Sequence, residues 1–145
     1  MNHHGGLRAP INEGPLTLGE VYEVMPFENQ VILVEVPGDQ IDLLVSFVAE
    51  TRTSMLWPAA FTVGPDGVSE ITINGAPVDP NRTYVLSVSD YLANGGNGFA
   101  MLKTLKRLDV EPMRLREMIL KEIQERTAQG DSISAVLPQL VREIK

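Results

Sequence analysis

The stretch that decides the fold is "SDYLANGGNGF", Ser89–Phe99. A carboxylate and an aromatic residue, Asp90 and Tyr91, end an apolar strand-like run, and three glycines follow within four residues, Gly95 to Gly98. Glycines permit positive φ and a close approach of a ligand to the backbone, and a loop that feeds a helix presents free N–H groups to an anion. A tight strand-to-helix turn without a ligand is the more ordinary interpretation of such a cluster. The spacing also fails the G-x-G-x-x-G fingerprint of dinucleotide-binding loops.

The segments around this stretch alternate between helix and strand patterns, which predicts an α+β fold in which a mixed β-sheet packs with helices. The expected elements are a helix capped by Thr17 and Glu20 and ending near Met25, a strand at 29–36, a helix at 39–50, a hairpin of 59–63 and 68–75, a strand at 83–89, a helix at 99–108 and a long helix at 111–129. The tail at 137–145 fits either a short strand or a helix.

Composition excludes several classes of protein. The 145 residues carry 12 Lys and Arg against 19 Asp and Glu, a formal charge of −7, so the chain lacks the basic surface that binding to DNA or RNA requires. There is no cysteine, which excludes disulfides and thiolate metal sites. No run reaches the roughly 18 apolar residues of a membrane span, and residues 1–10 do not resemble a signal peptide. We therefore expect a soluble chain without a membrane span.

No repeat or linker divides the chain, so residues 1–145 are expected to form a single domain. Residues 1–4, "MNHH", fit an authentic start, a truncation or the remnant of a tag, and we expect either a tag remnant or a floppy end there. The functional alternative for His3 and His4 is metal binding. Adjacent residues of an extended segment point to opposite sides, so the pair makes a poor chelate.

Three segments together resemble the C-terminal domain of the 5'-nucleotidase family, also called the UDP-sugar hydrolase family. They are "GGLRAPI" (5–11), "GPLTLGEVYEVMPFEN" (14–29) and "INGAPVDPNRTYVLSVSDYLANGGNGF" (73–99). The last is close to the family pattern N-D-[YF]-L-A-x-G-G-D-G-[YF]. The resemblance covers residues 5–105 in the family's order and implies the fold of that C-terminal domain, a domain that holds the nucleotide substrate.

The resemblance assigns the candidate substrate-binding residues. Phe27 and Tyr91 would stack on the two faces of the base, Arg8 would meet phosphate, Gly6 would offer backbone beside it, and Asp90 would reach the edge of the base. Stacking contributes roughly 1–3 kcal/mol per base, and arginine suits bidentate contact with phosphate. Without the resemblance, Phe27 is as easily a core aromatic, Tyr91 a cap on the sheet edge and Arg8 a solvated surface charge.

Three positions depart from the family pattern. Asn97 stands where the family usually has the Asp of G-G-D-G, so a neutral amide replaces a charged acceptor for ribose hydroxyls at a loss of ~1 kcal/mol. His3 occupies the place of a family asparagine five residues before the arginine, and Asn2 lies one position further upstream. Ser89 replaces a frequent Asn. These departures indicate a pocket that is weak, altered or selective for something unusual.

The chain carries no recognisable catalytic machinery. Two-metal hydrolysis requires clustered His, Asp and Asn ligands, and the sequence has two histidines and no D-x-H or H-E-x-x-H pattern. It also has no glycine-flanked serine elbow and no Cys–His pair. We expect no catalytic residue and no cofactor in this chain, and the isolated chain to be inactive. The divalent metal pair is expected in a separate metallophosphoesterase domain.

The function predicted from these observations is substrate recognition within a 5'-nucleotidase-type metallophosphohydrolase. The expected partners are a nucleotide or nucleoside and a metallophosphoesterase domain or chain that supplies catalysis. Two alternatives stay open: a binding module without any hydrolysis, and a scaffold or interaction domain that has lost the pocket. The resemblance also implies the periplasm or the cell surface as the location, while the preferred base and the oligomeric state stay undetermined.

Overall fold

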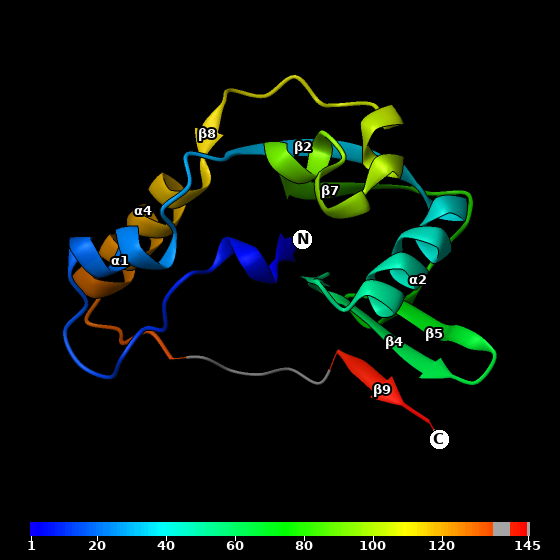
Figure 1. The fold of residues 1–145 in the computed structure, drawn as a ribbon, viewed down its shortest axis with the longest axis horizontal. Helices are drawn as coiled ribbons and strands as arrows, with labels where there is room; N and C mark the ends of the chain where they lie inside the picture. Colours follow the sequence, from blue (N-terminus) through cyan, green and yellow to red (C-terminus); the bar gives the residue numbers. More distant parts are fainter. Residues whose placement is uncertain (135–139, 145) are drawn as a thin grey trace.

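Strand β2 (Gln30–Pro37) runs along the upper part of the molecule in Figure 1 and carries a neighbour on each edge. The computed structural model describes residues 1–134 and 140–144. β7 (Thr83–Ser89) pairs antiparallel with β2 over its whole length, from Val31 opposite Ser89 to Pro37 opposite Thr83. The short β8 (Met113–Arg114) pairs with the beginning of β2 on the other edge. The three-stranded sheet therefore joins segments from the first, middle and last parts of the chain.

The second sheet has the strand order β6-β5-β4-β9. β4 (Ala59–Gly64) and β5 (Gly67–Ile73) form the predicted hairpin, and β6 (Ala76–Pro77) extends it. β9 (Val141–Glu143) pairs with β4 in parallel, which makes the sheet mixed. Of the two alternatives for the tail, a strand or a helix, this part forms a strand. The predicted α+β class with a mixed sheet is confirmed; residues 137–139 and 145 of the tail lie outside the described residues.

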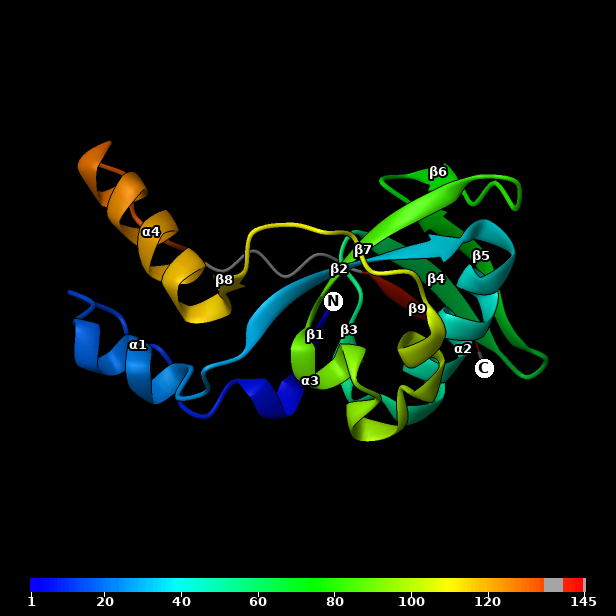
Figure 2. The ribbon, with the colours of Figure 1, turned by 90° about the horizontal axis from the view of Figure 1, so that it is seen from above.

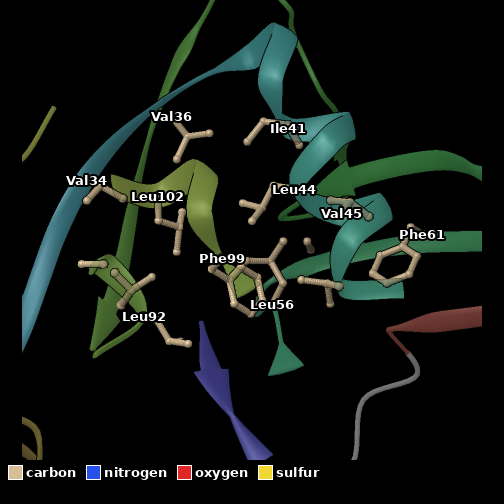
Figure 3. Close-up of a cluster of buried hydrophobic side chains, with 14 residues drawn as sticks. Val34, Val36, Ile41, Leu44, Val45, Leu56, Phe61, Leu92, Phe99 and Leu102 are labelled. Carbon is tan, nitrogen blue, oxygen red and sulfur yellow. The ribbon is translucent and has the colours of Figure 1, made fainter. Parts of the chain in front are cut away.

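The core lies between helix α2 (Ile41–Thr51) and the two sheets (Figure 3). Its helical face is the one that the spacing predicted, with Ile41, Leu44, Val45 and Val48 all buried. From β2 come Val34 and Val36, and from β4 comes Phe61. Phe99 and Leu102 are fully buried and fill the space over β2 just after the glycine loop. Phe99 meets the ring of Phe47 edge-on, with centroids 4.8 Å apart.

The predicted helix at 99–108 is wrong beyond Thr104. A 3-10 turn, η4 (Ala100–Thr104), ends at the extended Leu105, and the chain then follows β2. The backbone N–H of Glu35 donates to the Lys106 carbonyl at 2.8 Å, and that of Leu108 donates to the Leu33 carbonyl at 2.9 Å. Backbone groups of this segment, which would otherwise bond within a local helix, thus bond to the open edge of β2.

Helices α1 (Leu18–Val24) and α4 (Leu115–Ala128) lie side by side at one end of the molecule, away from the core (Figures 1 and 2). The predicted capping box is confirmed, since Thr17 and Glu20 bond reciprocally and this lowers the pKa of Glu20. α4 begins later than the predicted residue 111 because the preceding residues, 113–114, pair with β2. In the described ranges, no helix combines the length and the apolarity needed to cross a bilayer.

The amino-terminal residues are ordered, which corrects the expectation of a floppy end. β1 (Asn2–His3) pairs antiparallel with β3 (Ser54–Met55), and the N–H of His4 donates to the Thr53 carbonyl at 2.8 Å. The terminal amino group donates to the Ser87 carbonyl on β7 at 2.7 Å. These bonds are made by the backbone, so the residue types of "MNHH" gave no signal of them.

We expect Phe99→Ala to lower the free energy of unfolding by about 3–5 kcal/mol, because it removes a fully buried ring and leaves a cavity. Leu43→Ala on α2 is the matched control: its side chain is 59% exposed, and the expected change is within about 0.5 kcal/mol. Urea denaturation followed by circular dichroism measures both. A loss for Phe99→Ala no larger than that for Leu43→Ala would contradict this placement of the core.

Candidate functional site

The glycine loop begins where β7 ends. Ser89 caps the short helix α3 (Asp90–Ala93), its Oγ accepting a hydrogen bond from the Leu92 N–H at 3.3 Å. Beyond α3 the backbone turns through the left-handed region at Gly95, Asn97 and Gly98, with φ of +86°, +54° and +82°. Glycine adopts this region without strain and asparagine tolerates it. The loop is therefore a compact turn that brings the chain from the sheet into the core at Phe99.

Asp90 is held at the end of β2 by a bond to a distant residue. Its Oδ1 accepts from Asn29 Nδ2 at 2.7 Å and from the backbone N–H of Tyr91 at 2.8 Å. Among the described residues, no hydrogen bond is made to Oδ2. This leaves one oxygen of the carboxylate able to accept a bond from a ligand.

The Tyr91 ring lies against Gly96. A Cβ added at Gly96 would come within 2.5 Å of the ring, so only glycine permits this contact. The phenol hydroxyl donates to Asn97 Oδ1 at 3.1 Å, which fixes the ring from its far end. Tyr91 is still 51% exposed. The loop thus presents one supported aromatic ring to solvent, the arrangement that stacking on a planar ligand requires.

An open depression of about 430 Å³ lies beside this ring. Its lining residues are Asn29, Asp90, Tyr91, Asn94, Gly95 and Gly96. Another depression, of about 400 Å³, is lined by residues of α2, β4 and β9 among others, and most of its lining is aliphatic. We assign the candidate site to the depression at Tyr91, because it joins an exposed ring to a carboxylate and amides that can bond to a polar ligand.

Phe27 reaches the same end of the sheet through the register of β2. Val31 pairs with Ser89, so the residues before Val31 continue toward the segment that carries Tyr91. Phe27 is 41% exposed, which places neither aromatic ring in the core. Within the described part of the chain, the rings of Phe27 and Tyr91 do not contact each other, and Phe27 does not line the depression.

Arg8 and Gly6 lie on the neighbouring amino-terminal segment, outside the lining of the depression. The backbone N–H of Arg8 donates to the Val24 carbonyl at 2.9 Å, which holds this segment against the end of α1, three residues before Phe27. The Arg8 side chain is exposed. Gly6 ends the 3-10 turn η1 (His4–Gly6), and a Cβ there would lie 3.3 Å from Asn2 Oδ1.

The structure therefore brings Asp90 and Tyr91 into one depression, joins Asn97 to it through Tyr91, and leaves the other three candidates on adjacent segments. Sequence reasoning did not single out Asn29, and it treated Gly96 only as one of the three loop glycines. Asn29 was detectable as the last residue of the quoted "PFEN", whereas only the ring contact reveals why Gly96 is glycine.

The histidine pair has a structural role in the amino-terminal turn. His3 Nδ1 accepts from the Gly5 N–H at 2.9 Å, and burial, together with the charge of His4, lowers the pKa of His3. Over residues 1–134 and 140–144, no three His, Cys, Asp or Glu side chains gather in a group that could hold a metal ion. The described residues therefore do not fit a two-metal centre.

The family described as "5'-nucleotidase, C-terminal domain" matches residues 1–104. The chain belongs to this family. Protein UshA of Yersinia enterocolitica is 32% identical over 106 residues, which cover 70% of the chain and 19% of that protein. Protein UshA of Escherichia coli is 30% identical over 103 residues, covering 68% of the chain and 19% of the relative. The chain thus spans about a fifth of the length of these relatives.

Solved structures agree with this membership. The crystal structure of a 5'-nucleotidase precursor from Thermus thermophilus superposes with a TM-score of 0.80 at 26% identity, over 99% of the chain and 31% of that protein. The NAD nucleotidase of Haemophilus influenzae has the same fold, with a TM-score of 0.77 at 15% identity, over 99% of the chain and 29% of that protein. The 5'-nucleotidase C-terminal domain fold predicted from the sequence is therefore confirmed.

We expect Gly96→Ala to displace the Tyr91 ring while leaving the fold intact, because the new methyl group meets a half-exposed side chain that can swing away. Tyrosine ring resonances in NMR spectra should show a large shift for Tyr91 and small shifts for Tyr22 and Tyr84. Gly64→Ala is the control, since a Cβ there has no neighbour within 4 Å. An unchanged Tyr91 resonance in Gly96→Ala would contradict the ring contact.

Proposed function

We propose that the chain is the nucleotide-binding domain of a 5'-nucleotidase-type hydrolase, and that the depression at Tyr91 takes the nucleoside part of the substrate. The observation that carries the proposal is the Tyr91 ring, supported by Gly96 and Asn97 and exposed beside the Asp90 carboxylate, whose Oδ2 accepts no hydrogen bond from the described residues. A flat ring next to an acceptor suits a purine or pyrimidine, which has two apolar faces and N–H groups at its edge. Family membership supports the same substrate class.

For the remaining candidate residues we propose the roles that the family resemblance implies. Phe27 provides the second stacking face, from the segment that enters β2. Arg8 provides the positive charge for the phosphate, with Gly6 offering its backbone nearby. Asn97 faces the ribose with an amide in place of the family's carboxylate. Its Oδ1 already accepts from the Tyr91 hydroxyl, so its capacity for ribose hydroxyls is reduced.

Catalysis belongs, in this proposal, to a separate metallophosphoesterase domain or chain that carries the divalent metal pair. The coverage of about a fifth of the relatives' length supports this division of labour. The nucleotide would then lie between the two parts, its base on this domain and its phosphate at the metals. We also propose a periplasmic or cell-surface location and a part in nucleotide catabolism, both resting on family resemblance.

A second candidate is a binding or scaffold domain without any hydrolytic partner. The observation that favours it is Asn97, whose carbonyl oxygen bonds to the protein's own tyrosine and whose amide carries no charge for a ribose. The two functions differ in a simple respect: the first gains hydrolysis when a metallophosphoesterase domain is supplied, and the second does not.

We expect the purified chain to release no phosphate from AMP, with or without Mg²⁺, Mn²⁺ or Zn²⁺, because the described residues offer no metal cluster. A malachite-green assay measures the release, and a complete 5'-nucleotidase serves as the positive control. Metal-dependent release that disappears when a residue of this chain is substituted would contradict the proposal.

Adenosine and AMP should bind weakly, with dissociation constants from high micromolar to millimolar, corresponding to about 4–6 kcal/mol. Tyr91→Ala should weaken the binding of adenosine about tenfold or more by removing one stacking face, while Tyr91→Phe keeps the ring and retains most of the affinity.

Arg8→Ala should weaken the binding of AMP and leave the binding of adenosine nearly unchanged. Asn97→Asp should strengthen both ligands, since it keeps an acceptor for the Tyr91 hydroxyl and adds a charge for ribose.

Titrations followed by amide chemical shifts measure these affinities. The nucleotide-pocket proposal fails if Tyr91→Ala binds adenosine as well as the parent does, or if the parent shows no shift at millimolar ligand. In that case the scaffold function takes its place.

A further inference from the structure

Arg116 is the one arginine among the described residues whose side chain is buried. Only 7% of the side chain is exposed, although its neighbour Arg114 is 54% exposed. Burying a guanidinium is unfavourable unless its donors find acceptors. The acceptors of Arg116 come from the segment between α1 and β2, the segment that carries Phe27.

The Arg116 guanidinium contacts this segment at several groups. One terminal nitrogen, Nη1, donates to the Met25 carbonyl at 3.2 Å and to the Phe27 carbonyl at 3.4 Å. The other, Nη2, donates to the Glu28 carboxylate. The guanidinium carbon lies 4.0 Å from the centre of the Tyr22 ring, on α1. The hydrogen bond from Arg116 lowers the pKa of the Glu28 carboxyl and so favours its charged form.

The segment between α1 and β2 has no regular secondary structure, and these bonds hold its backbone instead. Helix α1 ends at Val24 and strand β2 begins at Gln30, so residues 25–29 belong to neither. Arg116 takes the carbonyls of residues 25 and 27, and the backbone N–H of Leu115 donates to the Asn29 carbonyl at 2.9 Å. Three alternate carbonyls are thus held by two consecutive residues at the beginning of α4.

We propose that Arg116 is the positioning residue of the nucleoside site: its guanidinium holds the backbone of the 25–28 segment, so that the half-exposed Phe27 ring, which lies outside the lining of the depression at Tyr91, is kept in place as the second stacking face of the base. The inference rests on the proposed function and adds a residue that lies beyond the part of the chain matched to the family, which ends at residue 104. A stacking face contributes to affinity only when it is held in place before the ligand arrives. Arg116 supplies that preorganisation without touching the ligand.

The first test is binding of adenosine to the full chain, measured by chemical-shift titration. Arg116→Met keeps the length of the side chain and removes its donors, and adenosine should bind about tenfold more weakly. Arg114→Met is the matched control. Arg114 also pairs with Glu28, at 3.1 Å, and its substitution removes the same charge from the same end of α4. Its affinity should stay within about twofold of the parent. Equal affinities for the parent and Arg116→Met would overturn the inference.

The second variant separates charge from geometry. Arg116→Lys keeps the positive charge, but a compact ammonium cannot reproduce the planar fork that serves two carbonyls and a carboxylate. Its affinity for adenosine should fall between those of the parent and Arg116→Met. Full recovery with lysine would show that charge alone suffices and would overturn the positioning role.

A ligand-free readout keeps this inference distinct from the proposed function. The chain has four phenylalanines, so incorporation of 4-fluorophenylalanine gives four ¹⁹F resonances, and Phe27→Leu assigns one of them. Arg116→Met should move the Phe27 resonance and leave those of the buried Phe61 and Phe99 in place. A Phe27 resonance unchanged in Arg116→Met would overturn the inference, whatever the parent binds.

The combined results distinguish failure of the proposed function from failure of the positioning role of Arg116. If the parent binds no adenosine but the Phe27 resonance moves, the proposed function fails while control of the ring by Arg116 stands. If the parent binds adenosine and Arg116→Met changes neither the affinity nor the resonance, the positioning role alone fails. If Arg116→Met loses the Phe61 and Phe99 resonances, the protein has unfolded, and Arg116→Lys decides by the same two measurements.

Discussion

The antiparallel pairing of β2 with β7 is the constraint on which the rest of the structure depends. It sets Val31 opposite Ser89 and thereby joins the segment that follows α1 to the glycine loop that follows β7. A shift of one residue would turn every side chain of β2 to the other face, moving Val34 and Val36 out of the core and separating Asn29 from Asp90. The register that buries Val34 and Val36 in the core therefore also determines the composition of the candidate site.

Local signals predicted those elements whose stability is local. The capping box of α1, the apolar face of α2 and the turn between β4 and β5 are all written in short stretches of sequence, and all three are confirmed. The segments that follow the glycine loop were misjudged. Residues 105–108 and 113–114 carry helix-compatible side chains, yet their backbones bond to β2. Such pairing depends on an open strand edge elsewhere in the chain, which a local pattern does not record.

The candidate site divides in the same way. "SDYLANGGNGF" placed a carboxylate, an aromatic ring and a tight loop together, and the structure shows them in contact. The bond between Asn29 and Asp90 and the role of Arg116 were beyond sequence reasoning. Helix α4 and its approach contain several arginines that look alike in the sequence, and only burial distinguishes Arg116 from Arg114. The family resemblance supplied the roles of Phe27 and Arg8, which composition and spacing alone left open.

The hold of α4 on the 25–29 segment has a thermodynamic consequence. If a ligand occupies the proposed site at Phe27, folding of the helix and that occupancy are linked equilibria, and linkage is reciprocal. To the extent that a docked α4 favours a ligand, the ligand favours the docked helix by the same free energy. Amide hydrogens of α4, far along the chain from the glycine loop, would then exchange more slowly with solvent whenever that loop is occupied. A helix without any residue at the proposed site would thus report on binding.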